Sequence, residues 1–583
     1  MTQSKNSFRL IATALSLAAL ASCAAPSGRD ANEFTLTIIG MNDVHGELAP
    51  RPGRGGVVAM SGFIDATRDA RAADGGAVLV IDAGDMWQGT LESNLGEGRA
   101  VVAAYNKIGV TAAAVGNHEF DFGPAGKAAI PASAADDPRG ALLQRASEAN
   151  FPLLAANIID EATGKPIAWR NVRPSTTVDV QGVTVGIIGV LSENGLRATI
   201  AANTVGLRMA PLLSTITDEA RRLRASGATV VIVTAHAGSR CTEFVDPTDL
   251  SSCRMGGEIM RLAEALPAGL VDHIVAGHVH QGIAHIVNGI AVTSSYSNTR
   301  AFSRVDLTID RGDGAVTGKQ VFPPQQACLR IVSTTGLCAT ADDDASLVVN
   351  TSYEGRPVVP DPVVAAIADR ATAFADATKR EKLGVRLASD FALVPDNESP
   401  LSNLMLQAVL QSVDGDVAIH NVLGGIRNSL PQGDLTYGAV YEMFPFDNRI
   451  VVLDLSGAQL RAVLAHQAHK HRRRAGIAGI RAAISCDSDE LEIVAVRPDG
   501  REVRDDERVR VIANDFLTLG GDDILTPVIP EGGFAIDESM PLVRDVLVDW
   551  FRNGPSTLAP EDFMTVGEPV WSVPATLPPG CSA

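Results

Sequence analysis

The sequence is poor in aromatic residues and in positive charge. Aromatic residues make up 4% of the 583 residues, and 49 Lys and Arg stand against 68 Asp and Glu, a formal net charge of −19. The negative electrostatic field of such a chain repels nucleic-acid phosphates, which argues against a general nucleic-acid binder. Beyond the N-terminal segment, no uninterrupted apolar run approaches the ~18 residues of a transmembrane helix, so none is expected there. Hydrophobic residues still make up 46% of the chain, enough for two large domains or three to four smaller ones.

A short apolar run near the N-terminus predicts export. A positively charged start precedes the run Leu10 to Ala21, which is too short to span a bilayer and is typical of a signal peptide. The run ends in Leu20-Ala21-Ser22-Cys23, which resembles a bacterial lipoprotein cleavage box. We therefore expect residues 1–22 to be removed, Cys23 to carry lipid and residues 23–33 to form a tether. The protein would then lie in the periplasm or on the outer membrane of a bacterium, in contact with the membrane through this lipid only. An ordinary signal peptide with a nearby cysteine is the alternative.

The other six cysteines predict disulfide bonds. An even number of cysteines in an exported chain is typical of disulfides. Six cysteines allow fifteen connectivities. Proximity in the chain favours three pairs: Cys241 with Cys253, Cys328 with Cys338, and Cys486 with Cys581. A metal site made of cysteines is less expected, because the chain contains no C-x-x-C motif.

Short apolar runs alternate with helical stretches in the first half of the chain. The runs are rich in Val, Ile and Ala and predict buried strands, whereas Leu207 to Ala225 predicts an amphipathic helix. The predicted strands are Phe34–Ile39, Ala77–Ile81, Ala112–Val115, Val183–Val190, Val230–Thr234 and Ile274–Ala276. This alternation predicts an α/β sandwich over residues 34–338. Residues 339–385 predict a polar loop followed by a linker helix over Pro362–Lys382, and a second domain follows over residues 386–583.

Polar residues of similar chemistry follow one predicted strand after another. Because the carboxyl ends of parallel strands share one edge of a sheet, side chains that follow different strands meet in one pocket. The oxygen and imidazole groups gathered there exceed the needs of one ion and suit two divalent transition metals such as Zn or Mn. They come from Asp43, His45, Asp85, Asn117, His236, His278 and His280. A lone histidine after a strand is usually structural, which is our interpretation of His273, His285 and His420, but five of the eleven histidines occupy these loops.

The order of these motifs resembles a known enzyme family. The motifs of the first domain resemble the calcineurin-like metallophosphoesterases and, more closely, the bacterial 5′-nucleotidase/UDP-sugar hydrolase family. They are Asn42-Asp43-Val44-His45-Gly46 and Gly116-Asn117-His118-Glu119-Phe120-Asp121. Three later motifs resemble the C-terminal domain of that family: Gly424-Gly425-Ile426-Arg427, Phe444-Pro445-Phe446-Asp447-Asn448 and Asn514-Asp515-Phe516. The resemblance implies a metallophosphoesterase α/β sandwich followed by a smaller α+β substrate-binding domain.

The resemblance also implies a role for each residue of the predicted centre. One metal ion would be held by Asp43, His45, Asp85 and His280, although some members of the family have Gln or Asn in place of this last histidine. The other would be held by Asp85, Asn117, His236 and His278, so that Asp85 bridges the pair. His118 matches the catalytic histidine and Asp121 its partner carboxylate.

The chemistry of such a centre is consistent with phosphoryl transfer. Two metal ions ~3.5–4 Å apart clamp a phosphoryl group and lower the pKa of bound water. If His118 is protonated through its pairing with Asp121, it can neutralise charge on the phosphoryl and leaving groups.

The second domain supplies candidate substrate contacts. The planar guanidinium of Arg427 suits phosphate, and the glycines before it allow close backbone approach. Phe446 and Phe516 can stack on a nucleobase, worth ~1–3 kcal/mol per base in nucleic-acid complexes; in the alternative interpretation both are core residues. Asp522 can accept hydrogen bonds from ribose hydroxyls, and Asn448 belongs to the same motif as Phe446.

Two positions depart from the family pattern. Asn397 stands where the family often carries an arginine, so one phosphate-binding arginine is missing. Asn421 is displaced by one residue from the asparagine of the N-G-G-G-I-R motif. Neither change affects the expected hydrolytic centre, but both put nucleotide selectivity in doubt.

A single basic run, His469-Lys470-His471-Arg472-Arg473-Arg474, does not change the prediction of no nucleic-acid partner. One short run in so acidic a chain is usually a solvated helix end or loop.

Together these features predict a monomeric 5′-nucleotidase, an enzyme that hydrolyses nucleoside 5′-phosphates with two divalent metal ions. The alternatives among enzymes are a nucleotide-sugar or dinucleotide pyrophosphatase, a 2′,3′-cyclic phosphodiesterase/3′-nucleotidase and a thiosulfohydrolase. Phe446, Phe516 and Asp522 favour nucleotides over sulfur substrates. From another class, a non-catalytic surface receptor for metal or nucleotide has no need of the intact His118 and Asp121 pair.

Overall fold

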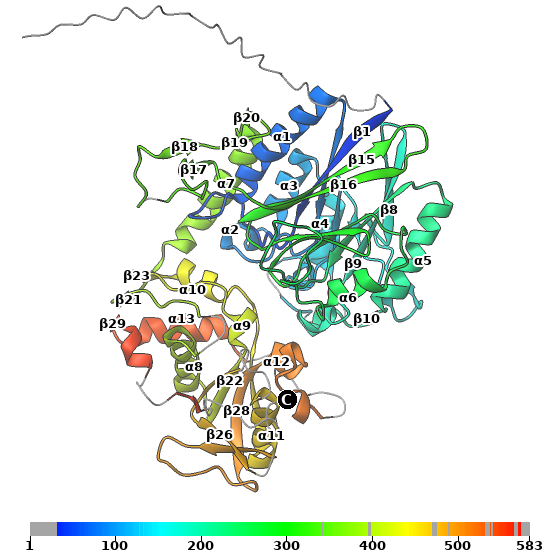
Figure 1. The fold of residues 1–583 in the computed structure, drawn as a ribbon. Coiled ribbons are helices and arrows are strands. Elements are labelled where there is room, and N and C mark those ends of the chain that lie inside the picture. Colours follow the sequence, from blue (N-terminus) through cyan, green and yellow to red (C-terminus); the bar gives the residue numbers. More distant parts are fainter. Residues whose placement is uncertain are drawn as a thin grey trace, which may run out of the picture.

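The computed structural model describes most of residues 32–572, which form two parts connected by one long helix (Figure 1). Within that span, the residues not described are 127–128, 132, 134, 341, 395–397, 469–474, 488–489, 531–533, 535–536, 538–539 and 565–568. Cys23, Asn397, Cys581 and the basic run at 469–474 therefore lie outside the described residues. No helix in the described part of the chain is long and apolar enough to cross a membrane.

Two β-sheets form the centre of the N-terminal part. The first has the order β16 (Val316–Gln326), β15 (Ala301–Asp310), β1 (Glu33–Met41), β2 (Ala77–Asp82), β3 (Ala112–Ala114), β4 (Leu153–Leu154) and β7 (Val172–Arg173). The second has the order β13 (Gly282–Val287), β14 (Ile290–Ser295), β12 (His273–Ala276), β11 (Val230–His236), β9 (Val183–Leu191) and β8 (Ser175–Val180). The central strands of both sheets are parallel, and all six predicted strands are confirmed.

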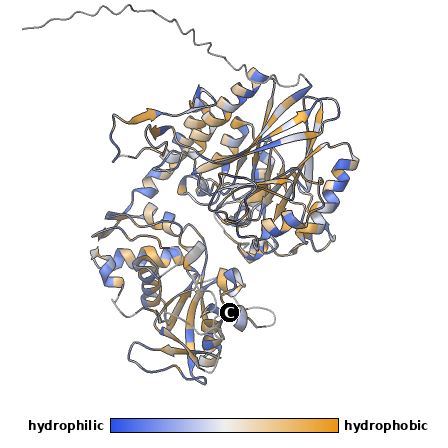
Figure 2. Ribbon diagram, in the orientation of Figure 1, coloured by the Kyte–Doolittle hydropathy of each residue, from blue (hydrophilic) through white to orange (hydrophobic). Residues whose placement is uncertain are grey.

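Alternate side chains of each central strand enter different hydrophobic layers. In β1, Leu36 and Ile38 pack between the sheets, whereas Ile39 and Met41 face the helices of the first sheet. These helices are α1 (Gly56–Asp74), α3 (Arg99–Ile108) and α4 (Gly140–Glu148); α5 (Leu212–Ala225) and α6 (Glu258–Ala265) cover the second sheet. Burial on both faces explains why the strands read as continuous apolar runs. The predicted α/β sandwich is confirmed, and Figure 2 shows hydrophilic residues along α5 at its surface.

Two predictions about local structure are wrong. The stretch Leu207 to Ala225 begins as the short strand β10 (Leu207–Met209), and helix α5 starts only at Leu212. The reason is Pro211, which disfavours the helical conformation at the residue before it. The predicted loop before the linker helix contains three short strands, β18 (Val348–Asn350), β19 (Ser352–Tyr353) and β20 (Arg356–Pro357).

The C-terminal part is built on a mixed four-stranded sheet. Its order is β24 (Ile450–Ser456), β28 (Arg508–Asn514), β22 (Val417–His420) and β25 (Gly476–Ala478). Ala418 and Ile512 face α8 (Pro400–Ser412) and α13 (Val543–Asn553), whereas Val417 and Val511 face α11 (Gly457–Ala468) on the other side. Two three-stranded sheets flank this core: β23 (Gly433–Thr436), β21 (Lys382–Leu387) and β29 (Thr557–Leu558); and β27 (Glu490–Val496), β26 (Arg481–Asp487) and β30 (Trp571–Ser572). The mixture agrees with the predicted α+β class.

Helix α7 (Pro362–Lys379) connects the two parts, close to its predicted extent. It packs on α1, α3 and the short helix α2 (Leu91–Asn94) of the N-terminal part, and it also contacts α10 (Tyr437–Met443) of the C-terminal part. The carboxylate of Asp361 caps the helix by accepting hydrogen bonds from the N–H groups of Val363 and Val364.

Disulfide bonds join Cys241 to Cys253 and Cys328 to Cys338. Cys486 lies on β26 and is also disulfide-bonded, while its predicted partner lies outside the described residues. The first two of these disulfide bonds are the pairs that proximity in the chain favours.

The cap of α7 generates a stability prediction. Asp361→Ala removes two hydrogen bonds to helix N–H groups and should cost about 0.5–2 kcal/mol. The urea midpoint of the N-terminal transition, followed by circular dichroism, should therefore fall. The control Asp369→Ala removes the same charge from an exposed position within the helix and should leave the midpoint unchanged or raise it. Equal midpoints for both variants would contradict the capping role.

Candidate metal centre and interdomain cavity

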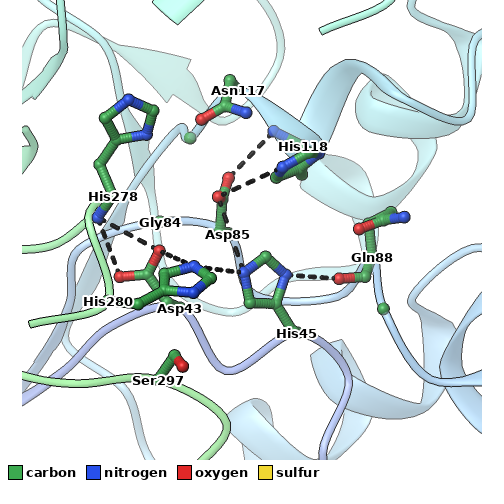
Figure 3. A network of polar contacts seen from close by, with 12 residues as sticks. Asp43, His45, Gly84, Asp85, Gln88, Asn117, His118, His278, His280 and Ser297 are labelled. Atoms are coloured by element: carbon green, nitrogen blue, oxygen red, sulfur yellow. Dashed lines mark hydrogen bonds and ion pairs between the residues drawn. The ribbon is translucent and has the colours of Figure 1, made fainter. Parts of the chain in front are cut away.

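The seven predicted ligands meet at the carboxyl edge of the two central sheets. Asp43 and His45 follow β1, Asp85 follows β2, and His236 ends β11. The other three are Asn117, His278 and His280, which follow β3 and β12. Figure 3 shows six of these side chains converging on one space, with His118 beside them. All seven residues come together from five separate chain segments, as the strand order predicts.

The donor atoms divide into two groups. Asp43, His45 and His280 form one, and Asp85, His236 and His278 the other; within each group one donor atom per residue lies within 4.8 Å of the others. The Nε2 atoms of His45 and His280 are 3.0 Å apart, and Nδ1 of His278 lies 3.2 Å from Nε2 of His236. Two ring nitrogens that face each other can share only one proton, whereas a cation can accept both lone pairs.

Asp85 faces both donor groups, and Asn117 lies beside the second. Oδ2 of Asp85 lies 3.0 Å from Nε2 of His236 and 4.0 Å from Nε2 of His45, so this carboxylate faces both groups. Oδ1 of Asn117 lies 3.0 Å from Nε2 of His236, which places it with the second group. This division matches the one implied by the family resemblance.

The protonation states of three predicted ligands suit metal binding. Burial, together with the nearby Arg427, holds the pKa of His45 well below its ordinary value, and burial beside His236 lowers the pKa of His278 to about 4. Both imidazoles are therefore neutral at pH 7, the form that binds metals. Burial opposes ionisation of Asp43, but the neighbouring His280 outweighs it and lowers the pKa of this carboxyl. His236 differs, because Asp85 outweighs the effect of burial and raises its pKa to about 10, so this imidazole must lose a proton to bind a metal ion. Carboxylates and imidazoles together form a donor set that fits two divalent transition metals.

The backbone at the centre is strained. Five of the seven predicted ligands have φ in the left-handed region: Asp43 at 49°, His45 at 50°, Asp85 at 56°, His278 at 75° and His280 at 56°. Such a conformation costs of order 1–3 kcal/mol at a non-glycine residue and persists only where the surrounding structure imposes it. Strain at five positions of one cluster therefore supports a functional site.

A buried glutamate holds two of the ligand loops together, and sequence reasoning gave it no role. The carboxylate of Glu119 accepts hydrogen bonds from the N–H groups of Asp85, Met86 and Gly116, at 2.7–2.8 Å. Burial and the nearby Asp85 raise its pKa to about 7. The one sequence signal was its place directly after Asn117 and His118.

Two of the predicted histidine ligands are oriented by carbonyl groups. Nδ1 of His45 donates to the carbonyl oxygen of Gln88 at 2.8 Å, and Nδ1 of His236 donates to that of Ala83 at 2.7 Å. These bonds leave each Nε2 lone pair facing the centre, the usual arrangement of histidine ligands.

His118 lies beside the centre without belonging to either donor group. Its Nδ1 lies 2.6 Å from Oδ2 of Asp121, and Thr199, which sequence reasoning missed, donates to the other carboxylate oxygen at 2.7 Å. Burial alone would lower the pKa of His118, but Asp121 and Asp85 outweigh it and raise this pKa above its ordinary value. Nη2 of Arg427 lies 3.0 Å from Nε2 of His118, so the second domain contacts this imidazole directly.

A cavity of about 440 Å³, called here the nucleoside cavity after the ligand predicted from the sequence, lies between the two parts. The first part contributes Asp85, Asn117, His118, Asp121, His278 and His280; the predicted contacts from the second are Arg427, Phe446, Asn448, Phe516 and Asp522. The guanidinium of Arg427 lies over the ring of Phe446, 5.1 Å from its centroid. Asn421 also reaches the cavity despite its displacement, and its amide donates to Asp522.

The core interpretation of the two phenylalanines is correct in part. Phe446 packs against the cluster around α8 and Phe516 against the one around α11, yet both rings also line the cavity. Asn448 is buried, and its amide donates to Asp515, so it supports the loop around Phe446.

The other buried histidines lie outside the centre. His273 contacts the hydroxyl of Thr293, His420 contacts the amide of Asn514, and His285 lies beside the disulfide of Cys253. None of these three lines the nucleoside cavity.

Comparisons with known proteins agree with this architecture. Residues 36–282 match the model of the calcineurin-like phosphoesterase family, and residues 377–528 match that of the 5′-nucleotidase C-terminal domain. Protein UshA of Yersinia enterocolitica is 25% identical over 513 residues, covering 84% of this chain and 86% of the relative. A 5′-nucleotidase of Vibrio cholerae is 26% identical over 552 residues, covering 88% and 90%. The crystal structure of a 5′-nucleotidase precursor from Thermus thermophilus has the same fold, with a TM-score of 0.68, 22% identity and coverage of 90% and 97%.

Metal content tests the role of Asp85. Because this carboxylate faces both donor groups, Asp85→Ala should leave fewer than two tightly bound ions per chain and abolish activity. Elemental analysis of metal-loaded, gel-filtered protein measures this. Asp121→Ala is the matched control, since its carboxylate faces His118 instead of the ligands and two ions should be retained. Two tightly bound ions in Asp85→Ala would refute the assignment.

Proposed function

Because the chain belongs to the metallophosphoesterases that carry a 5′-nucleotidase C-terminal domain, and is thus a phosphoric monoester hydrolase, we propose that it hydrolyses nucleoside 5′-phosphates at two divalent metal ions. The observation that carries the proposal is the nucleoside cavity, where the donor groups and His118 face Arg427 and two aromatic rings across one space. A phosphoryl group at the donor groups would have its nucleoside directed toward Phe446 and Phe516.

The two donor groups would hold the ions, with Asp85 shared between them. When bound, the ions would polarise the phosphoryl group and make a water molecule acidic enough to attack at neutral pH. Burial of the surrounding carboxylates and imidazoles keeps bulk water away, which strengthens every electrostatic interaction in the site.

His118 would assist the departure of the nucleoside. Asp121 and Thr199 fix the orientation of the ring and direct Nε2 into the cavity. A protonated imidazole held there neutralises charge on the phosphoryl group and can donate a proton to the leaving 5′-oxygen. Asp121 stabilises this charged form.

Arg427 would bind the phosphate from the opposite side. Its guanidinium is half-buried, contacts His118 and lies over the ring of Phe446. A phosphate that enters between Arg427 and His118 would accept a hydrogen bond from each of them. The direct contact between these two side chains would then be replaced by two charge-assisted hydrogen bonds to the substrate.

Phe446, Phe516 and Asp522 would recognise the nucleoside. The rings offer apolar faces for the base, and the Asp522 carboxylate, held by Asn421, offers acceptors for ribose hydroxyls. We also propose that the protein is exported, that its domains follow the boundaries predicted from the sequence, and that it acts as a monomer anchored by lipid on Cys23.

A substrate panel combined with His118→Ala tests the reaction. The metal-loaded protein should hydrolyse AMP faster than UDP-glucose or a 2′,3′-cyclic nucleotide, measured by chromatography of the products, because hydrolysis of the last two yields phosphate monoesters instead of inorganic phosphate. His118→Ala should retain two ions while kcat falls ~100-fold or more, the scale of lost acid and electrostatic assistance. The control His466→Ala changes a partly exposed histidine of the second domain and should have wild-type activity. Faster turnover of UDP-glucose or the cyclic nucleotide would refute the monoesterase proposal, and metal loss in His118→Ala would refute the role of this residue.

The aromatic pair predicts a difference between substrates. Phe446→Ala combined with Phe516→Ala should raise KM for AMP about tenfold or more, since ~1.4 kcal/mol of stacking corresponds to one decade. Hydrolysis of p-nitrophenyl phosphate should change far less, because this small ester gains little from contacts with a base. Steady-state kinetics at constant metal content measure both. Equal losses for the two substrates would show that the rings act only in the core.

A further inference from the structure

A second cavity, of about 220 Å³, adjoins the donor groups on the side of His45. Here it is called the arginine cavity. It shares His280, Gln281 and Arg427 with the nucleoside cavity, so the two spaces meet at the candidate metal centre. Figure 3 shows the separation: Ser297, which lines the arginine cavity, lies near Asp43 and His280, while Asn117 and His118 lie on the far side of Asp85.

The arginine cavity carries a local excess of positive charge. Four arginines line it, Arg51, Arg54, Arg300 and Arg427, against two glutamates, Glu47 and Glu442. Glu47 pairs with Arg51 and Arg54, and Glu442 pairs with Arg51 and Lys379, so the excess positive charge lies with Arg300 and Arg427. In a chain with a net charge of −19, such an excess beside a phosphoryl-transfer centre indicates a site for an anion.

Arg300 is an arginine of this cavity whose side chain forms no hydrogen bond or ion pair with the described residues. Its side chain is partly exposed, and Arg54 is the charged group that shifts its pKa. Partial burial and the like charge of Arg54 lower the pKa of Arg300, so two guanidinium groups face the same space. Like charges held together in this way are stabilised by an anion that both can contact.

The loop that carries Arg300 is fixed to the metal-ligand segments. The N–H of Asn298 donates to the carbonyl oxygen of Asp43 at 2.8 Å, and the hydroxyl of Thr299 accepts from the N–H of Gly56 at 2.9 Å. Thr299 has φ of 53°, a strained conformation for a β-branched residue. This anchoring keeps Arg300 at the edge of the cavity next to Arg54, in a position that does not depend on substrate.

We propose that Arg54 and Arg300 form a second phosphate-binding subsite, on the side of the metal centre opposite the nucleoside cavity. Ser297, Asn298 and Asn428 line the same cavity and supply polar groups around the anion. The proposal rests on the proposed phosphoesterase function, since it assigns a second phosphate site to the same catalytic centre. The phosphate has two sources: the inorganic phosphate released by the reaction, or a further phosphate group of a nucleoside polyphosphate.

Direct binding tests the subsite. Isothermal titration calorimetry of inorganic phosphate into the metal-loaded full chain, at low ionic strength, should detect two phosphates per chain. Arg300→Gln should weaken one of them about tenfold or more, the scale of a lost charge-assisted hydrogen bond, and Arg300→Lys should restore part of the affinity. The control Arg370→Gln removes the same charge from an exposed position on α7 and should titrate like the wild type. A single phosphate in the wild type, or equal titrations for Arg300→Gln and the wild type, would overturn the proposal.

Asp85→Ala separates this subsite from the proposed function. The variant should lose the phosphate that depends on metal and keep the one that depends on Arg300. If the wild type fails to hydrolyse AMP and still shows Arg300-dependent binding, the proposed function is wrong while the subsite stands. If AMP is hydrolysed and this binding is absent, the subsite alone is wrong.

Kinetics identify the source of the phosphate. If the subsite takes the released product, Arg300→Gln should raise the inhibition constant of inorganic phosphate about tenfold. If it takes a second phosphate of the substrate, kcat/KM for ADP should fall about tenfold relative to AMP. Either change supports the subsite, and no change in both measurements would overturn it.

Discussion

The geometry of the candidate metal centre depends on one buried carboxylate. Glu119 accepts three backbone N–H bonds and thereby connects the loop after β2 to the loop after β3. The first loop carries Asp85, the predicted bridge, and the second carries Asn117 and His118. A buried carboxylate without partners is very unfavourable, as are buried N–H groups without acceptors, so each half of this arrangement requires the other. The N–H of His118 also donates to the Asp85 carboxylate at 2.9 Å, so Glu119 and this direct bond together hold the predicted bridge beside His118.

The two domains contribute different kinds of chemistry to one space. The N-terminal sandwich supplies oxygen and imidazole donors on rigid strand ends, and the C-terminal domain supplies a guanidinium and aromatic rings. The interface is polar: Gln88 donates to the carbonyl oxygen of Pro445, and Lys379 at the end of α7 pairs with both Glu92 and Glu442. Polar interfaces of this kind are typical of domains that move relative to each other. Such motion would open the nucleoside cavity, which is bounded by both domains, to a substrate.

Much of the fold and of the donor set could be predicted from the sequence, because both follow from local patterns. Strands buried on both faces appear as apolar runs, and the residues after them share a sheet edge. Features that depend on distant partners could not be predicted. Thr199 reaches Asp121 across 78 positions, and Glu119 acts on backbone groups that any residue provides. Arg54, Arg300 and Arg427 belong to three separate segments with no common motif, so only the folded chain shows that they surround one cavity.

The left-handed backbone at five of the predicted ligands has a consequence for the evolution and engineering of this protein. Glycine adopts this conformation without strain, so glycine at Asp43, His45, Asp85, His278 or His280 would relieve a local cost of order 1–3 kcal/mol. The same change would delete a donor atom from the centre. A selection for thermal stability alone would therefore favour the loss of these side chains, whereas a selection that also required the proposed metal centre would retain them at a cost in stability.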